Sequence, residues 1–74
     1  MNFETLKSET QQIIDLIAEK NISQAEIKLV EVSDHLDDFL DTSNDDEDLV
    51  EIARYQVLLN HLHQKIENLK IQLN

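Results

Sequence analysis

The chain of 74 residues contains no glycine and no proline. Sheets, hairpins and tight turns depend on glycine, because it adopts positive φ angles without steric cost. With neither residue present, regular helices joined by short polar turns are the simplest architecture. Phosphate-binding loops of the Walker and dinucleotide-binding types are excluded for the same reason, since their backbones require several glycines.

Apolar residues recur at helical spacing in three segments of the chain. Steps of three and four place them on one face in each of the first two segments, which predicts helices at about residues 3–20 and 24–40. In the third segment the spacing keeps a period of 3.5 residues, as in a coiled coil, and predicts a helix at about residues 45–72. The three apolar seams consist of Phe3, Leu6, Thr10, Ile13 and Ile17; of Ala25, Leu29, Val32, Leu36 and Phe39; and of Ile52, Tyr55, Leu59, Leu62, Ile66, Leu69 and Leu73.

Two polar breaks separate the helical segments. At the first, Ser23 and Glu26 have the spacing of a capping box, in which two side chains bind the free backbone N–H groups that start a helix. The second break, residues 41–44, consists of Asp, Thr, Ser and Asn, which bond to their own backbone in turns. We expect Asp45 or Ser43 to cap the third helix, with acids in its first turn stabilised by the helix dipole.

The short connections predict that neighbouring helices run antiparallel. The expected fold is therefore an all-α, up-down-up three-helix bundle with coiled-coil-like packing and a long third helix, in a single domain covering residues 1–74. The expected core contains Phe3, Leu6, Ile13, Ile17, Leu29, Val32, Leu36, Leu59 and Leu62.

The third predicted helix is longer than the other two. At 1.5 Å per residue it spans roughly 40 Å, against roughly 26 Å for each of the others, so it should overshoot their hairpin by roughly 13 Å. A chain of this size has a marginal core, and burial of the overshooting part against a second copy would add to it. We therefore expect a homodimer or higher homo-oligomer, although fraying of this end is an alternative. The predicted oligomer interface consists of Leu62, Ile66, Leu69 and Leu73.

The acidic residues are concentrated in one part of the chain. Residues 29–53 carry ten acids and no lysine or arginine, so they account for the formal net charge of −10. Acids at the start of the third helix complement its dipole, whereas acids at the end of the second helix oppose the dipole there. The segment is either a docking surface for a basic protein or a solvated, solubilising end. The predicted partner-binding residues are Asp34, Asp37, Asp38, Asp41, Asp45 and Asp46.

The acids and histidines lack the spacing of a metal site. A calcium loop of the EF-hand type requires glycine at position six and glutamate at position twelve, and the segment that starts at Asp41 has neither. His61 and His63 are two residues apart on a helix and point to different sides. His35 shares a face with one or two aspartates only, which is too few ligands for zinc. We expect no metal and no cofactor.

The sequence contains no arrangement typical of a catalytic site. There is no paired nucleophile and base, and a chain this short has little room for a substrate cavity. We expect a non-enzymatic protein-interaction or regulatory module that self-associates through its third helix and presents the acidic segment to a partner. The alternative is an acidic decoy or inhibitor, similar to immunity or antitoxin proteins, which mimics nucleic acid in a basic groove of another protein.

Charge and hydropathy also bear on partners and location. The negative charge argues against binding to nucleic acid or to an anionic membrane surface. No apolar run approaches the roughly 20 residues that cross a bilayer. The N-terminal residues do not resemble a signal peptide, and the absence of cysteine fits a reducing compartment, so we expect a cytoplasmic protein.

Overall fold

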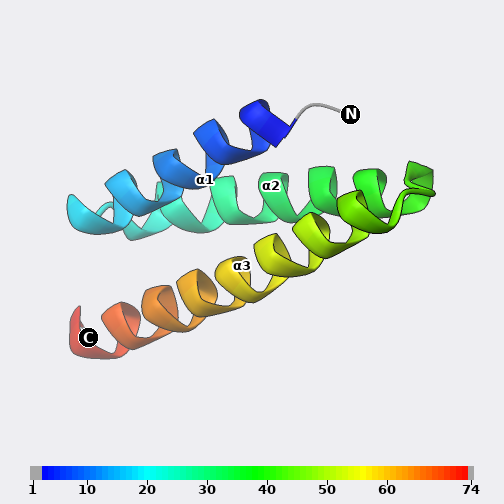
Figure 1. Cartoon of the computed structure of the whole chain (residues 1–74). Coiled ribbons are helices and arrows are strands. Elements are labelled where there is room, and N and C mark those ends of the chain that lie inside the picture. Colours follow the sequence, from blue (N-terminus) through cyan, green and yellow to red (C-terminus); the bar gives the residue numbers. More distant parts are fainter. Residues whose placement is uncertain (1–2, 74) are drawn as a thin grey trace.

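The computed structural model describes residues 3–73, with only the backbone described for Leu73. It consists of three helices, α1 (Phe3–Ala18), α2 (Ile22–Thr42) and α3 (Asp46–Leu73), and no strand occurs within residues 3–73. The helices run up, down and up along one long axis (Figure 1). Both α1 and α3 pack against α2, while they contact each other much less. The predicted all-α three-helix bundle is confirmed.

The first connection is a left-handed turn made without glycine. Lys20 has a φ of 61°. Its N–H donates to the carbonyl of Ile17 at 2.9 Å, and the N–H of Asn21 donates to the carbonyl of Leu16 at 2.9 Å. This pair of bonds is the Schellman pattern, which satisfies the last carbonyls of a helix and is usually made with glycine at the left-handed position.

The capping box predicted at Ser23 is wrong. The second helix begins at Ile22, so Ser23 lies inside its first turn, and Asn21 occupies the N-cap position without a side-chain hydrogen bond. The reason is that the Schellman turn closes at Asn21, and α2 starts directly after it. By contrast, Asp45 caps α3 as expected, because its Oδ1 accepts a hydrogen bond from the N–H of Glu47 at 3.0 Å.

One continuous core runs along the bundle. It contains all the predicted core residues except Phe3, which is half-buried against it. The buried members are Leu6, Ile13, Ile17, Ala25, Leu29, Val32, Leu36, Ile52, Leu59, Leu62 and Ile66. Thr10, a polar position on the seam of α1, is also buried, and its hydroxyl donates to the carbonyl of Leu6 at 2.8 Å. That bond meets the hydroxyl's need for a partner within the core.

An aromatic cluster joins all three helices near the start of α1. The ring of Phe3 meets Phe39 of α2 edge-on, with centroids 5.9 Å apart, and stacks on Tyr55 of α3 with centroids 6.2 Å apart. Both arrangements are favourable for aromatic pairs. Burial raises the pKa of the Tyr55 phenol, and the nearby Glu51 carboxylate raises it further.

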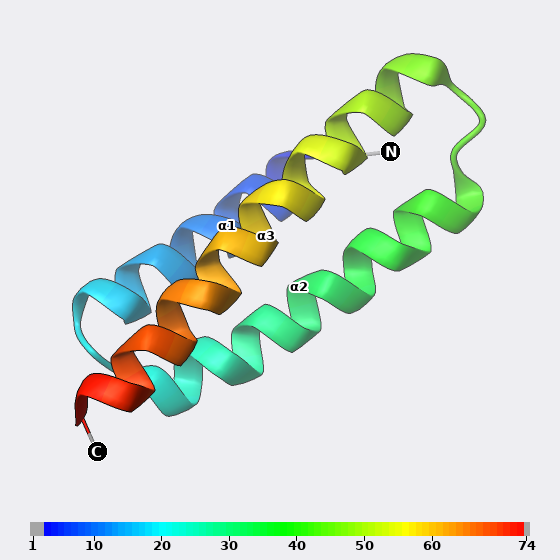
Figure 2. The same ribbon diagram turned by 90° about the horizontal axis from the view of Figure 1, so that it is seen from below.

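The expectation that the end of the third helix overshoots the other two helices, and is free to be buried against a second copy, is wrong. Ile66 is 0% exposed, Leu62 is buried, and Leu69 packs against the same core. Lys70 forms an ion pair with Glu26 of α2. The C-terminal end of α3 lies beside the connection between α1 and α2, so the start of α2 covers it (Figure 2). The side chain of Leu73 lies outside the described residues.

The part of α3 that α1 does not cover lies at the opposite end. The helix α1 has 16 residues and α3 has 28. Phe3, at the start of α1, stacks on Tyr55, so the turns of α3 before Tyr55 and the last turn of α2 extend beyond α1 (Figure 2). This end contains most of the acids, and we refer to residues 34–51 as the acidic end.

The positive φ of Lys20 generates a stability prediction. The left-handed conformation costs a residue with a Cβ atom roughly 1–2 kcal/mol, which glycine avoids, although glycine loses more backbone entropy on folding. We expect Lys20→Gly to be more stable than Lys20→Ala by about 0.5–1 kcal/mol. Urea denaturation measures both free energies. The alanine variant is the matched control, because both substitutions remove the lysine amine. Equal free energies of unfolding for the two variants would show that the left-handed conformation at residue 20 has no net cost.

The burial of Ile66 generates a second prediction. Ile66→Ala removes buried methyl groups and leaves a cavity, so we expect a loss of about 2–5 kcal/mol in the free energy of unfolding. Ile71→Ala is the matched control on the same helix, where the side chain is 74% exposed, and its effect should stay within about 0.5 kcal/mol. Thermal or urea unfolding of both variants tests this, and a small, equal effect would show that Ile66 lies outside the core.

Candidate functional site

The six predicted partner-binding residues lie together at one end of the bundle. Four belong to the last turns of α2, and two belong to the connection and the start of α3. All six are exposed, namely Asp34, Asp37, Asp38, Asp41, Asp45 and Asp46. The end of α2 and the start of α3 are joined here (Figure 2), so the structure places the two halves of the acidic segment at the same end of the bundle.

The two halves of this surface have opposite electrostatic effects. Asp46, Glu47 and Asp48 stand in the first turn of α3, where carboxylates complement the dipole. The last turn of α2 contains no basic residue, so Asp41 stands unopposed at the negative end of that helix.

Like charges also stand close together on α2. Asp34 and Asp38 are one turn apart, as are Asp37 and Asp41, and such pairs repel one another. None of these four carboxylates forms an ion pair within the described chain. This half of the surface therefore lowers the stability of the folded state.

Exposed apolar side chains accompany the acids at this end. Leu40, Leu49 and Val50 are among the large hydrophobic residues left exposed by the fold. They lie on the turns of α2 and α3 that extend past α1, where no third helix covers them. A surface of carboxylates and exposed aliphatic side chains complements a segment that carries basic and apolar residues together.

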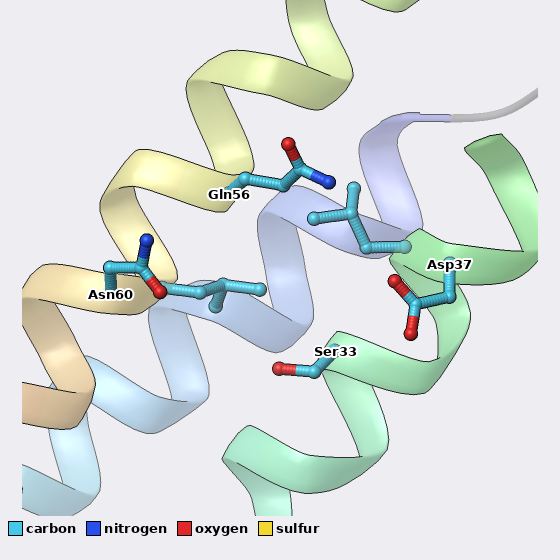
Figure 3. A pocket seen from close by; sticks show the side chains of 6 residues that line it. Ser33, Asp37, Gln56 and Asn60 are labelled. Atoms are coloured by element: carbon cyan, nitrogen blue, oxygen red, sulfur yellow. The ribbon is translucent and has the colours of Figure 1, made fainter.

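A polar groove lies between α2 and α3 beside the acidic end. Its volume is about 320 Å³, with Leu36 and Leu59 among its lining residues. Ser33 and Asp37 line one side, and Gln56 and Asn60 line the other (Figure 3). These groups offer hydrogen bonds to a bound segment. The lining contains no imidazole or amine that would take the proton of Ser33, so this groove lacks the pairing that activates a serine nucleophile.

A second groove, of about 210 Å³, lies between α1 and α3 near the C-terminal ends of both helices. Ile14, Ile17, Ala18, Leu62 and Leu69 supply its apolar lining, and Lys20 and Lys65 also line it; we call it the lysine-rimmed groove. Two of the predicted interface residues, Leu62 and Leu69, therefore face an opening in the surface. Ile66 does not, because it is buried in the core.

A buried glutamate that the sequence analysis did not identify connects α1 to α2. Glu9 Oε2 lies 3.0 Å from Nδ1 of His35 and 4.0 Å from Nζ of Lys28. The sequence did indicate that Glu9 could be buried, because its spacing from Leu6 and Ile13 places it on the apolar face of α1. His35 faces Glu9 in this arrangement, while His61 and His63 are exposed on α3.

The described chain does not bring metal ligands together. Within residues 3–73, no group of three or more histidine, cysteine, aspartate or glutamate side chains could hold a metal ion. None of the three helices is both long enough and apolar enough to cross a membrane, as far as the described residues go. Comparison of the chain with protein-family models, curated proteins and solved structures finds no significant match.

The opposite dipole environments of the two halves generate a third prediction. Asp41→Asn removes a carboxylate from the negative end of α2 and should raise the free energy of unfolding by about 0.3–1 kcal/mol at low salt. Asp46→Asn is the matched control, since it removes one carboxylate from the positive end of α3 and should lower it by a similar amount. Denaturation at low and high ionic strength measures both. If both substitutions changed the free energy of unfolding in the same direction, the opposite dipole environments of the two halves would be contradicted.

Proposed function

We propose that this chain is a non-enzymatic interaction module that binds a basic, amphipathic segment of a partner protein at its acidic end and self-associates through its third helix. The observation that carries the first part is the coincidence of unpaired carboxylates with exposed Leu40, Leu49 and Val50 on the turns that α1 leaves uncovered. The acids would steer a basic partner, and the apolar side chains would add salt-resistant affinity.

The cost in stability supports a functional role for the acids. Carboxylates at the end of α2 oppose the helix dipole and repel one another, and a surface needed only for solubility could place the same charge elsewhere. Proteins retain destabilising residues where function requires them. The absence of cysteine is consistent with action in the cytoplasm, which forms part of the proposal.

The alternative function, a decoy that mimics nucleic acid, has less support. A decoy requires negative charge spaced along a whole face, as on a duplex. Here the exposed carboxylates gather at one end, and the six acids outside residues 29–53 are matched by six bases. An interaction that depends on both charge and apolar contact fits this distribution better.

A designed helical peptide with lysine on one face and leucine on the other tests the acidic end. We expect it to bind the chain, and to bind Asp38→Asn/Asp41→Asn at least about tenfold more weakly, which corresponds to about 1.4 kcal/mol. Asp15→Asn/Glu19→Gln is the matched control, because it removes one charge from α1 and one from the turn that follows it, and keeps the acidic end intact. Fluorescence anisotropy gives the dissociation constants.

Two outcomes of this experiment would contradict the proposal. Equal weakening in both double variants would show that net charge alone attracts the peptide. The second outcome concerns a peptide whose leucines are replaced by glutamine. If this peptide still binds, and its binding disappears at high salt, the exposed apolar side chains take no part in binding and the decoy function is favoured.

A further inference from the structure

The lysine-rimmed groove lies between α1 and α3 near the C-terminal ends of both helices. Its lining residues come from the C-terminal halves of α1 and α3 and from the turn that follows α1. Ile14 is exposed at its edge, and Leu69 is only partly buried. Because α1 and α3 both pack on α2 and contact each other little, the groove lies on the side away from α2, where a fourth helix would complete the bundle.

The charge of the groove differs from that of the rest of the chain. Lys20 and Lys65 stand among its lining residues, and neither forms an ion pair within residues 3–73. Lys28 and Lys70, in contrast, are paired with glutamates. Two unpaired lysines beside apolar side chains favour an amphipathic helix with acidic flanks. They disfavour docking of two such grooves against each other, which would bring four lysines together.

The outer face of α2 has the complementary chemistry. Ile27 and Val30 are 54% and 60% exposed, opposite the buried positions of the same helix. Glu31 and Asp34 follow within one turn, and both are exposed; Glu31 pairs with Lys28 of the same helix at 3.5 Å, whereas Asp34 forms no ion pair within residues 3–73. We call these four residues the outer stripe of α2. It is the kind of helix face that the groove favours, with aliphatic side chains followed by carboxylates.

We propose that the lysine-rimmed groove of one copy binds the outer stripe of α2 of a second copy. Ile27 and Val30 would enter between Ile14 and Leu69, and Glu31 and Asp34 would approach Lys20 and Lys65. This inference rests on the self-association in the proposed function and identifies its two surfaces. The third helix takes part through Leu62, Lys65 and Leu69, which line the groove, whereas Ile66 of the predicted interface is buried in the core.

The geometry of the two surfaces determines the form of the assembly. The outer stripe faces away from α1 and α3, whereas the groove opens between those two helices. A contact between unlike surfaces of this kind is head-to-tail, so an open assembly of any length retains one free groove at one end and one free stripe at the other. The assembly therefore grows with concentration beyond a dimer, unless rotation between copies closes it into a ring.

Two variants with complementary defects test this arrangement by sedimentation velocity. Ile27→Gln/Val30→Gln disables the stripe and keeps the groove, and Ile14→Gln/Lys65→Glu disables the groove and keeps the stripe. Each should associate with itself about 100-fold more weakly than the unmodified chain, because apolar burial is lost. A mixture of the two should form a one-to-one dimer and stop there, since only one productive contact remains.

The control and the contrary outcomes separate this inference from the proposed function. Val57→Gln replaces a valine that is 55% exposed on α3, outside the lining of the groove, and should associate like the unmodified chain. Self-association that persists in Ile27→Gln/Val30→Gln would overturn the docking while leaving self-association intact. An unmodified chain that stays monomeric at high concentration would overturn both, without affecting the binding of a basic peptide at the acidic end.

Discussion

The difference in length between α1 and α3 determines which surfaces this bundle leaves uncovered. Both helices pack on α2, and short turns fix where each begins and ends relative to it. The aromatic contact between Phe3 and Tyr55 sets the register of the two outer helices. Since α1 has 16 residues and α3 has 28, the uncovered turns fall at the start of α3 and the end of α2. The acidic end follows from this register.

Electrostatics then divides the molecule into regions with different chemistry. The bases of α2 and α3 are largely occupied by local acids, as in the pairs Lys28 with Glu31 and Arg54 with Glu51. Exposed pairs of this kind contribute little to stability, so apolar burial must supply most of it. The charges without an ion pair include four aspartates of α2 at one end and two lysines near the other, and a partner that neutralised them would gain electrostatic free energy there.

The sequence was sufficient to predict the bundle because its apolar seams are nearly uninterrupted. Residues such as Ile13 and Leu36 lie in the core where their spacing places them. The first turn was not predictable from side chains, because hydrogen bonds between backbone groups around Lys20 override the cap that Ser23 could offer. The observed α2 is longer than predicted at both ends, Ile22–Thr42 rather than about 24–40, and its first turns lie beside the end of α3, where Lys70 pairs with Glu26.

Contacts between helices were the other limit on prediction from sequence. Glu9 sits in the register of a core position, but its partners His35 and Lys28 lie on another helix, and local spacing cannot bring them together. The same holds for the lysine-rimmed groove, since Ile14 and Lys65 are far apart along the chain. The acidic end was predictable because its two halves are neighbours in sequence, joined by a turn of three residues between Thr42 and Asp46.

The two proposed interactions would be linked through charge. Each copy carries a formal net charge of −10, so copies repel one another at long range even where their contact surfaces match. A basic segment bound at the acidic end would neutralise part of that charge and reduce the repulsion between copies. By reciprocity, assembly would concentrate acidic ends and strengthen the attraction for a basic partner. Asp34 belongs to both surfaces, so the basic segment and the groove of a second copy would compete for this one carboxylate, which would offset part of the coupling.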